Sequence, residues 1–154
     1  SEMCIETALA ALTEEVFCDL DPVAEKHQVR LIQTDGDCTV TGSYILLYRA
    51  VYNLVENAIK YNRPSGSVTV NIHSAESAVL EVTDTGIGIS PENQEKIFDP
   101  FYRVDKSRSR AMGGAGLGLA LVSEIARQHN GQVKVTQSSE KGSTIALMLP
   151  VTLL

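Results

Sequence analysis

Residues 43–62 read SYILLYRAVYNLVENAIKYN, and this run predicts a long helix from Ser43 to about Asn62. Ser43 is a good N-cap, and the run RPSG at residues 63–66 ends the helix. Apolar residues recur at helical spacing in two adjacent rows, so most of the helix is predicted to be buried. The rows are Ile45, Tyr48, Tyr52, Val55 and Ile59, and Leu47, Val51, Leu54 and Ala58.

A polar row runs along the same helix. It consists of Arg49, Asn53, Glu56 and Lys60; Asn57 lies one turn on from Asn53, and Tyr61 lies one turn on from Asn57. Exposure of this helix face to solvent is enough to explain Arg49. Asparagine is a poor helix former, so two of them suggest a role for the amide oxygens, such as holding Mg²⁺ while Lys60 meets phosphates. Taken alone, the row leaves both interpretations open.

The elements on either side of this helix predict an α+β fold. Downstream we expect strands 68–72 and 79–83, a short helix from Ser90 to about Phe98, a helix 117–129 and a final hairpin of strands 132–137 and 143–149. Upstream we expect a helix 7–27, kinked or divided at Pro22, and a hairpin of strands 29–32 and 38–40. Three main helices and about six strands predict a two-layer sandwich, one helical layer on one sheet.

Composition excludes several classes of protein. The chain has 154 residues, 44% of them hydrophobic, which fits one globular domain over residues 1–154. No apolar run has the roughly 18 residues of a spanning helix. The net charge of −6 argues against a nucleic-acid-binding protein. Three cysteines without metal spacing predict idle or buried thiols in an intracellular protein, and the three scattered histidines predict structural or surface roles.

Two glycine-rich runs carry candidate site residues. DTGIG, residues 84–88, follows a predicted strand, so Asp84 could accept a hydrogen bond from an exocyclic amine such as that of adenine; an ordinary turn is the alternative. GGAGLG, residues 113–118, leads into a helix and predicts a phosphate site at its N-terminus. The second run is neither a Walker A loop nor the dinucleotide-binding fingerprint.

The segment between these runs is basic and shows no regular period. Five of the thirteen Lys and Arg residues lie within positions 96–110, which predicts either attraction for a triphosphate or a solvated basic loop. Phe98 and Phe101 are expected to anchor the root of this loop to the core. The length of the span 99–116 indicates a functional loop or a mobile lid.

Four runs together resemble the N, G1, F and G2 boxes of sensor histidine kinases, in order and spacing. They are NLVENAIKY at 53–61, DTGIG at 84–88, FDPF at 98–101 and GAGLGL at 114–119. The resemblance covers nearly the whole chain, including the closing KGST at 141–144. It implies the catalytic ATP-binding domain of the GHKL, or Bergerat, fold: a mixed sheet backed by three helices, with a flexible ATP lid at about 90–116.

The resemblance assigns roles to individual residues. It implies that Asn57 is the Mg²⁺ ligand, that Asn53 supports it, and that Asp84 reads adenine. It places Arg103, or another basic lid residue, at the γ-phosphate, and Glu56 beside Asn53 as an acidic neighbour or as a polar residue at the helix edge. The other positions implied to bind ATP are Lys60, Tyr61, Gly86, Gly88, Ile89, Phe98, Gly114, Gly116, Leu117, Gly118 and Leu119.

Asn53 separates branches of the family. Gyrase-like and Hsp90-like ATPases would place an activating Glu there, and an amide is no general base. A sensor kinase is therefore favoured, over a nucleotide-binding regulatory module without transferase activity or a gyrase-like or Hsp90-like ATPase module. Ala115 stands where Thr or Ser is frequent, a change expected to matter little.

One departure concerns the phosphoacceptor. In these kinases it is a histidine followed by an acidic residue, whereas His27, His73 and His129 precede Gln28, Ser74 and Asn130. The resemblance therefore implies a piece of a longer kinase, with two protein partners: the dimerisation and histidine phosphotransfer domain of that kinase, and the receiver domain of a response regulator. It implies a cytoplasmic domain of a membrane-anchored parent, without membrane contact of its own.

Overall fold

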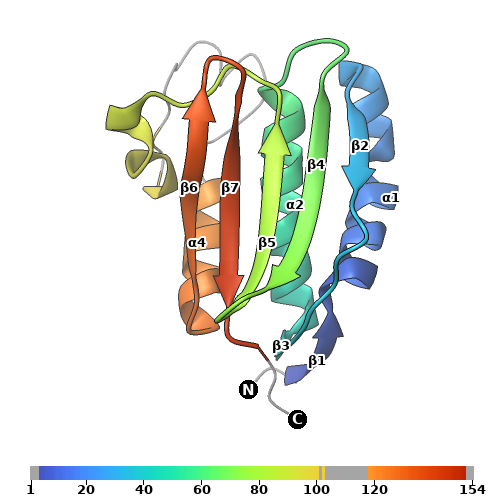
Figure 1. The fold of residues 1–154 in the computed structure, drawn as a ribbon, viewed down its shortest axis with the longest axis vertical. Coiled ribbons are helices and arrows are strands. Elements are labelled where there is room, and N and C mark those ends of the chain that lie inside the picture. Colours follow the sequence, from blue (N-terminus) through green and yellow to red (C-terminus); the bar gives the residue numbers. More distant parts are fainter. Residues whose placement is uncertain (1–3, 101, 103–117, 152–154) are drawn as a thin grey trace.

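The described chain is built in two layers, helices on one face of a mixed sheet (Figure 1). A computed structural model describes residues 4–100, 102 and 118–151. Within these residues the helices are α1 (Leu9–His27), α2 (Tyr44–Lys60) and α4 (Gly118–Gln128). The sheet has the order β2 (Arg30–Gln33), β4 (Ser67–Ser74), β5 (Ala78–Asp84), β7 (Gly142–Leu149), β6 (Gln132–Ser139). The predicted α+β sandwich is confirmed.

Strand directions follow from the connections. The predicted hairpins β4–β5 and β6–β7 are both present and antiparallel, as is the β5–β7 pair between them. β2 pairs with β4 in parallel, because α2 lies between them in the chain as a crossover. The sheet is therefore mixed, and the C-terminal end of β5 lies at the same end of the sheet as the β6–β7 turn (Figure 1).

The predicted hairpin of strands 29–32 and 38–40 is wrong. β3 (Thr39–Ser43) pairs instead with β1 (Cys4–Ala8), which forms a separate two-stranded sheet. The connecting segment does not reverse direction, because it runs along β4: the Thr34 N–H donates to the Val70 carbonyl, and a Cβ on Gly36 would lie 1.8 Å from the Ile72 carbonyl oxygen. The turn-forming residues at 34–37 therefore form an extended connection along β4 instead of a tight turn.

The first helix also departs from its prediction. It begins at Leu9 rather than Thr7, because residues 4–8 form β1. It is not divided at Pro22, which lies inside a continuous α1. No N-cap side chain of its own serves the helix; Asp37 accepts a hydrogen bond from the Ala10 N–H at 2.9 Å, so a residue 27 positions away satisfies one of its free donors.

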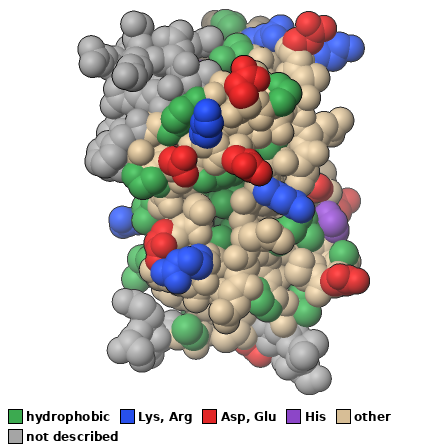
Figure 2. Space-filling model, turned by 90° about the vertical axis from the view of Figure 1, so that its left-hand side faces the viewer, with side chains coloured by type: hydrophobic (Ala, Val, Ile, Leu, Met, Phe, Trp, Pro, Cys, Tyr) green, Lys and Arg blue, Asp and Glu red, His purple; other side chains and the backbone are tan. Residues whose placement is uncertain are grey.

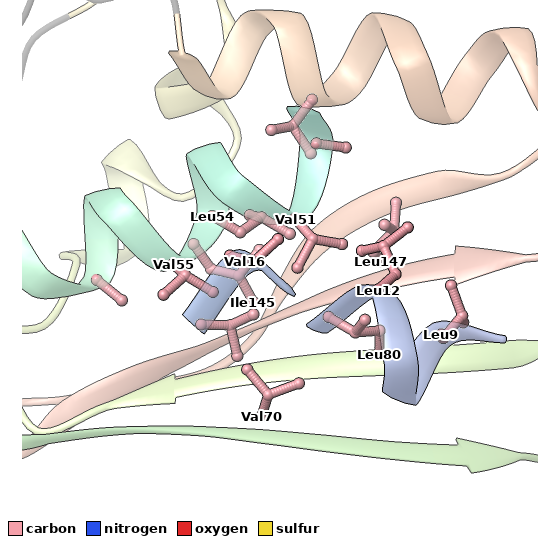
Figure 3. Packing of buried hydrophobic residues seen from close by; sticks show 14 of the residues in the cluster. Leu9, Leu12, Val16, Val51, Leu54, Val55, Val70, Leu80, Ile145 and Leu147 are labelled. Carbon is pink, nitrogen blue, oxygen red and sulfur yellow. The ribbon is translucent and has the colours of Figure 1, made fainter. Parts of the chain in front are cut away.

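The core lies between the helices and the main sheet. Figure 3 shows side chains of α1 and α2 pointing toward side chains of the strands. The residues labelled there are fully or almost fully buried. The labelled residues are Leu9, Leu12 and Val16, then Val51, Leu54 and Val55, and from the sheet Val70, Leu80, Ile145 and Leu147. Burial of this apolar surface supplies the main driving force for holding the two layers together.

Helices α2 and α4 are tied together at the start of α2. Ser43 caps α2 as predicted, with its hydroxyl accepting from the Leu46 N–H at 3.3 Å. His129 accepts the Ser43 N–H on Nε2 at 3.1 Å, and its Nδ1 lies 2.8 Å from the Ile125 carbonyl oxygen. This is the structural role expected for a histidine. Asn130 ends α4 with φ +60°, the predicted left-handed cap.

The segment after β5 forms two 3₁₀ turns, η1 (Pro91–Asn93) and η2 (Lys96–Phe98), where a single short helix was expected. The predicted Ser90 cap is absent, because its hydroxyl accepts from the Asn93 side chain instead of a backbone N–H. Ile97 is buried and Phe98 packs on the core, so Phe98 anchors the root of the loop as predicted. Phe101 lies outside the described residues.

Two further expectations concern the three thiols and membrane spans. All three cysteines are free; Cys4 and Cys18 are exposed, and Cys38 is half-buried and packs against the core. None of the helices described has the length and apolarity to cross a membrane.

Ile45 was predicted to belong to the buried apolar face of α2, and this prediction is wrong. It is 66% exposed, whereas Ile59 on the same helix is fully buried. We expect Ile59→Ala to lower the free energy of unfolding by roughly 2–5 kcal/mol, because it leaves a cavity, and Ile45→Ala to change it by less than about 0.5 kcal/mol. Urea denaturation measures both. Equal losses would mean that Ile45 is buried against another part of the chain.

Candidate nucleotide-binding site

Asp84 ends β5 and is held by three hydrogen bonds. Its Oδ1 accepts from the Gly86 N–H at 2.9 Å and from the Ser143 N–H at 3.3 Å, and its Oδ2 accepts from the Ser143 hydroxyl at 3.1 Å. Ser143 is placed there by β-sheet register, in which it pairs directly with Asp84. The carboxylate is therefore fixed in orientation, and Oδ2 retains capacity for a donor from a ligand.

Burial shifts the pKa of the Asp84 carboxyl. It raises the pKa of the Asp84 carboxyl above its ordinary value, and the donors from Gly86 and Ser143 oppose the rise without cancelling it. A half-buried carboxylate with a perturbed pKa at the end of a central strand is a typical binding-site feature.

The glycines of the DTGIG run permit two close approaches. A Cβ on Gly86 would lie 2.4 Å from the Tyr61 carbonyl oxygen, so the turn packs directly on the C-terminal end of α2. Gly88 has φ +77°, and its Cβ would lie 2.0 Å from the Ser139 carbonyl oxygen of β6. A side chain at either position would separate these elements, which explains why both residues are glycine.

Sequence reasoning missed a polar cluster beneath this turn. The Thr85 hydroxyl donates to Asn62 Oδ1 at 2.9 Å and accepts from the Ser67 N–H at 2.9 Å, while Asn62 Nδ2 donates to the Ser67 carbonyl at 2.9 Å. These bonds join the end of α2, the start of β4 and the turn after β5. Asn62 and Ser67 are five positions apart, and Thr85 reaches them because the antiparallel pairing of β4 with β5 brings the end of β5 to the start of β4.

Thr85→Val removes this hydroxyl without changing the shape of the side chain. We expect a loss of unfolding free energy of about 0.5–1.5 kcal/mol, because Asn62 and the Ser67 N–H lose their partner at an exposed position where water can replace it in part. Thr85→Ser keeps the hydroxyl and should retain most of the stability in thermal or urea denaturation. If serine is as damaging as valine, the methyl group and not the hydrogen bonds holds the turn.

The polar row of α2 faces partly outward, as its sequence indicates. Asn53, Glu56, Asn57, Lys60 and Tyr61 are all half-buried. Lys60 Nζ lies 3.8 Å from Glu56 Oε2, an i,i+4 pair that accounts for Glu56 as a helix-edge residue. Among the described residues, no hydrogen bond engages the Asn57 side chain, and it lies one turn from both Asn53 and Tyr61.

Asn53 connects the polar row to the second glycine run. Its Nδ2 donates to the Gly118 carbonyl at 3.5 Å, and a Cβ on Gly118 would meet only the Asn53 side chain. Gly118 opens α4, so the N-terminal end of that helix faces the middle of α2. Ile89, Phe98 and Leu119 are half-buried and pack on the core nearby.

Some predicted site residues cannot be placed. Arg103, Gly114, Gly116 and Leu117 lie outside the described residues, as does Ala115. The structure therefore brings together Asp84, Gly86, the polar row of α2 and the start of α4.

The arrangement provides two different chemistries along one helix. At the C-terminal end of α2 lies the Asp84 carboxylate, which suits an amine donor. Asn53 lies eight residues back along the helix, about 12 Å away, and faces the start of α4, and the N-terminal end of a helix favours an anion. Within the described part of the chain no cluster of three or more His, Cys, Asp or Glu could hold a metal. A cation here would be bound by amide and phosphate oxygens, which suits Mg²⁺.

Comparison with known proteins decides the family. Residues 42–153 match the family described as Histidine kinase-, DNA gyrase B-, and HSP90-like ATPase. The chain belongs to this family. Its relatives include the sensor histidine kinase RppB of Synechocystis, 40% identical over 149 residues, which are 96% of this chain and 32% of RppB. The chain thus spans about a third of the length of the curated relatives it matches.

Solved structures of the family share the whole fold. The mycobacterial sensor histidine kinase MprB superposes with a TM-score of 0.81 at 27% identity, covering 98% of this chain and 99% of that one. Full-length ShkA in complex with AMPPNP superposes at 0.86 and 23% identity, covering 100% of this chain and 32% of ShkA. The resemblance to histidine kinase catalytic domains is confirmed, as is the fold that it implied.

Proposed function

We propose that this chain is the catalytic ATP-binding domain of a longer sensor histidine kinase, with the domain spanning 1–154 and an ATP lid at about 90–116. It binds ATP·Mg²⁺ and presents the γ-phosphoryl group to a histidine on a separate dimerisation and phosphotransfer domain. One observation carries the proposal: a fixed, half-buried Asp84 lies at one end of α2, and Asn53 meets the start of α4 at mid-helix. This spacing suits a nucleotide with base and phosphates at opposite ends.

The base would bind at the turn after β5. Asp84 Oδ2 would accept from the exocyclic amine of adenine, because the other donors to this carboxylate already fix its plane. Gly86 and Gly88 let the turn close on Tyr61 and on β6, which would hold the turn backbone beside the ring. Tyr61 and Ile89, which border it, would supply apolar contact.

The phosphates would lie along the polar row. The Asn57 amide oxygen would hold Mg²⁺ with support from Asn53, and Lys60 would meet a phosphate in place of its weak pairing with Glu56. The metal, when bound, neutralises phosphate charge. Lid residues Gly114, Gly116 and Leu117, together with Gly118 and Leu119, would bring backbone amides to the phosphates, and Arg103 would reach the γ-phosphate.

Catalysis would consist of positioning and charge neutralisation. Asn53 cannot remove a proton, so the position where the gyrase-like and Hsp90-like ATPases would place an activating Glu offers the acceptor no general base. An imidazole acceptor is already nucleophilic. The bond between Pγ and the oxygen that bridges it to Pβ breaks, and ADP leaves with the electron pair while a P–N bond forms to the imidazole. This displacement requires in-line geometry above all.

The partners follow from the same proposal. The phosphohistidine would pass its phosphoryl group to the aspartate of a response-regulator receiver domain. The parent protein would be anchored in a membrane through other segments, with this domain on the cytoplasmic side.

Transfer in trans tests the function. The purified chain is mixed with the separately produced histidine-bearing domain of the same kinase and with γ-labelled ATP and Mg²⁺. Acid-labile label on the histidine is the expected result. Tight ATP binding without any label would favour a regulatory module, and steady ATP hydrolysis by the chain alone would favour a gyrase-like or Hsp90-like ATPase.

The raised pKa of Asp84 predicts a pH dependence. The ionised carboxylate accepts from adenine, so ATP affinity should fall as pH drops through the raised pKa, which lies above the ordinary value of about 4. The folded state also holds this proton more tightly than the unfolded state does. Its contribution to stability is therefore present at low pH and lost as pH rises through that pKa. Calorimetric titration with AMPPNP from pH 4.5 to 7.5 measures the affinity, and Asp84→Asn should abolish this dependence.

A further inference from the structure

Two walls enclose residues 84–88, which we call the base turn. One wall is the C-terminal end of α2, where a Cβ on Gly86 would lie 2.4 Å from the Tyr61 carbonyl oxygen. The other wall is the turn between β6 and β7, where a Cβ on Gly142 would lie 2.0 Å from the Asp84 carbonyl oxygen. Figure 1 shows all three segments at the same end of the molecule. The proposed adenine site is therefore built on a turn whose backbone contacts two other segments.

Each wall is hydrogen-bonded to the base turn. On the α2 side, the Thr85 hydroxyl donates to Asn62 Oδ1 at 2.9 Å. On the strand side, Ser143 donates its N–H to Asp84 Oδ1 at 3.3 Å and its hydroxyl to Oδ2 at 3.1 Å. Ser143 follows the β6–β7 turn directly, because β7 begins at residue 142. The orientation of the Asp84 carboxylate therefore depends on where that turn lies.

Arg63 joins the two walls. Its N–H donates to Asn62 Oδ1 at 2.8 Å, so its backbone is tied to the same amide oxygen that Thr85 binds. Its side chain reaches the other wall, where Nη2 donates to the Glu140 carbonyl oxygen in the β6–β7 turn. The two residues are 77 positions apart, so only the folded chain brings them together. This bond closes a ring of contacts around the base turn.

The charge of Arg63 offers no competing explanation within the described chain. Its side chain is exposed, and none of the described carboxylates forms an ion pair with it. On the face shown in Figure 2, acidic and basic side chains are interspersed, so they form no basic patch to which Arg63 could add. The hydrogen bond to the β6–β7 turn is the interaction that the structure assigns to this guanidinium.

Resting on the proposed function, we infer that Arg63 is a positioning residue for the adenine base: its bond to the β6–β7 turn holds Ser143 where it orients the Asp84 carboxylate. Arg63 itself does not contact the nucleotide. Arginine suits this role, because its long side chain ends in a donor group that stays charged, and a charged donor strengthens the bond to a carbonyl. Without the bond, the turn can shift, and the preference for adenine over guanine weakens.

Arg63→Ala tests the inference by calorimetric titration. We expect the affinity for AMPPNP to fall roughly three- to tenfold, as for the loss of one hydrogen bond, and the ratio of the affinities for ATP and GTP to fall by a similar factor. Because the effect lies at the base, ADP should lose the same factor, with or without Mg²⁺ and at low or high salt. Arg63→Lys keeps a charged donor and should restore most of the affinity.

Histidine labelling gives a second measurement. Arg63→Ala should raise the KM for ATP and leave the rate at saturating ATP within about twofold of wild type, because the phosphate end of the site is unchanged. Arg127→Ala is the matched control. Arg127 is an exposed arginine whose described partner is Glu124 on the same helix, far from the base turn in sequence, and its loss should change neither the affinity nor the KM.

A double-variant cycle tests the route through Ser143. Ser143→Ala removes the hydroxyl that donates to Asp84 Oδ2. Since Arg63 acts by placing that hydroxyl, adding Arg63→Ala to Ser143→Ala should cost less than about twofold in affinity for AMPPNP. Equal losses from Arg63→Ala in the wild-type chain and in Ser143→Ala would show that Arg63 does not act through Ser143, and would overturn the inference.

The remaining outcomes are equally decisive. A lower melting temperature of Arg63→Ala, with unchanged affinity and an unchanged ratio for ATP and GTP, would leave Arg63 a structural role only and overturns the inference. A loss confined to AMPPNP with Mg²⁺, or one that vanishes at high salt, would place the guanidinium at the phosphates and overturns it too. A wild-type chain that binds no AMPPNP instead refutes the proposed function itself, on which the inference depends.

Discussion

Replacing Asn57 by alanine is expected to lower the affinity for ATP in the presence of Mg²⁺ by roughly 10- to 100-fold. Asn57 is half-buried on α2, with no hydrogen bond to its side chain among the described residues, so its amide is available to a cation. Removing the amide deletes one oxygen ligand and leaves the fold almost intact. Calorimetry with AMPPNP, with and without Mg²⁺, measures the effect.

The matched control is Asn71→Ala. Asn71 lies on β4, where its amide bonds Thr34 and Glu81 outside the site. This variant should lose some stability and keep its affinity for nucleotide. For Asn57→Ala we expect the reverse, a small change of the melting temperature and a large loss of affinity that disappears when EDTA removes the metal. An equal loss without Mg²⁺ would show that Asn57 contacts the nucleotide directly.

Asp84→Asn is expected to cost roughly 100-fold or more in ATP affinity and to abolish the preference for adenine over guanine nucleotides. The carboxylate accepts from Gly86 and Ser143 and would accept from the adenine amine. An amide keeps the shape but presents an N–H₂ group to donors. Guanine carries a carbonyl where adenine carries its amine, so only the wild-type carboxylate discriminates between them.

Titration with ATP and GTP measures this loss, and Ser143→Ala provides a graded comparison. Serine contributes one hydroxyl donor to Asp84 Oδ2, while its N–H remains, so we expect an intermediate loss of affinity. Unchanged selectivity in Asp84→Asn would move the base to another part of the chain.

Local patterns predicted those elements whose partners are close in sequence. The apolar periodicity of α2, its Ser43 cap and the hairpins β4–β5 and β6–β7 are all confirmed, because helical and hairpin bonds join residues a few positions apart. The strand at residues 4–8 was missed, since its partner β3 lies some 35 positions away and nothing local distinguishes it from the start of a helix.

Local patterns likewise indicated some residues of the candidate site and not others. Gly86, Asn53 and Asn57 were predicted as site residues because glycine and asparagine are costly in ordinary strands and helices, and Asp84 was predicted because it directly precedes such a glycine run. Ser143 could have been found from the pairing of β5 with β7, which places it opposite Asp84. The Asn62–Thr85–Ser67 bonds could not, because all three residues are common in plain turns.

By itself, the sequence determined the α+β class, the family and the chemical groups available for a nucleotide, since each depends on residue type and short-range spacing. Tertiary structure alone decided that β2 joins β4 instead of β3, that Ile45 faces outward, and that Arg63 bonds the β6–β7 turn. These outcomes depend on how helices cross over a sheet, and that crossing is set by the total burial of apolar surface rather than by any local run of residues.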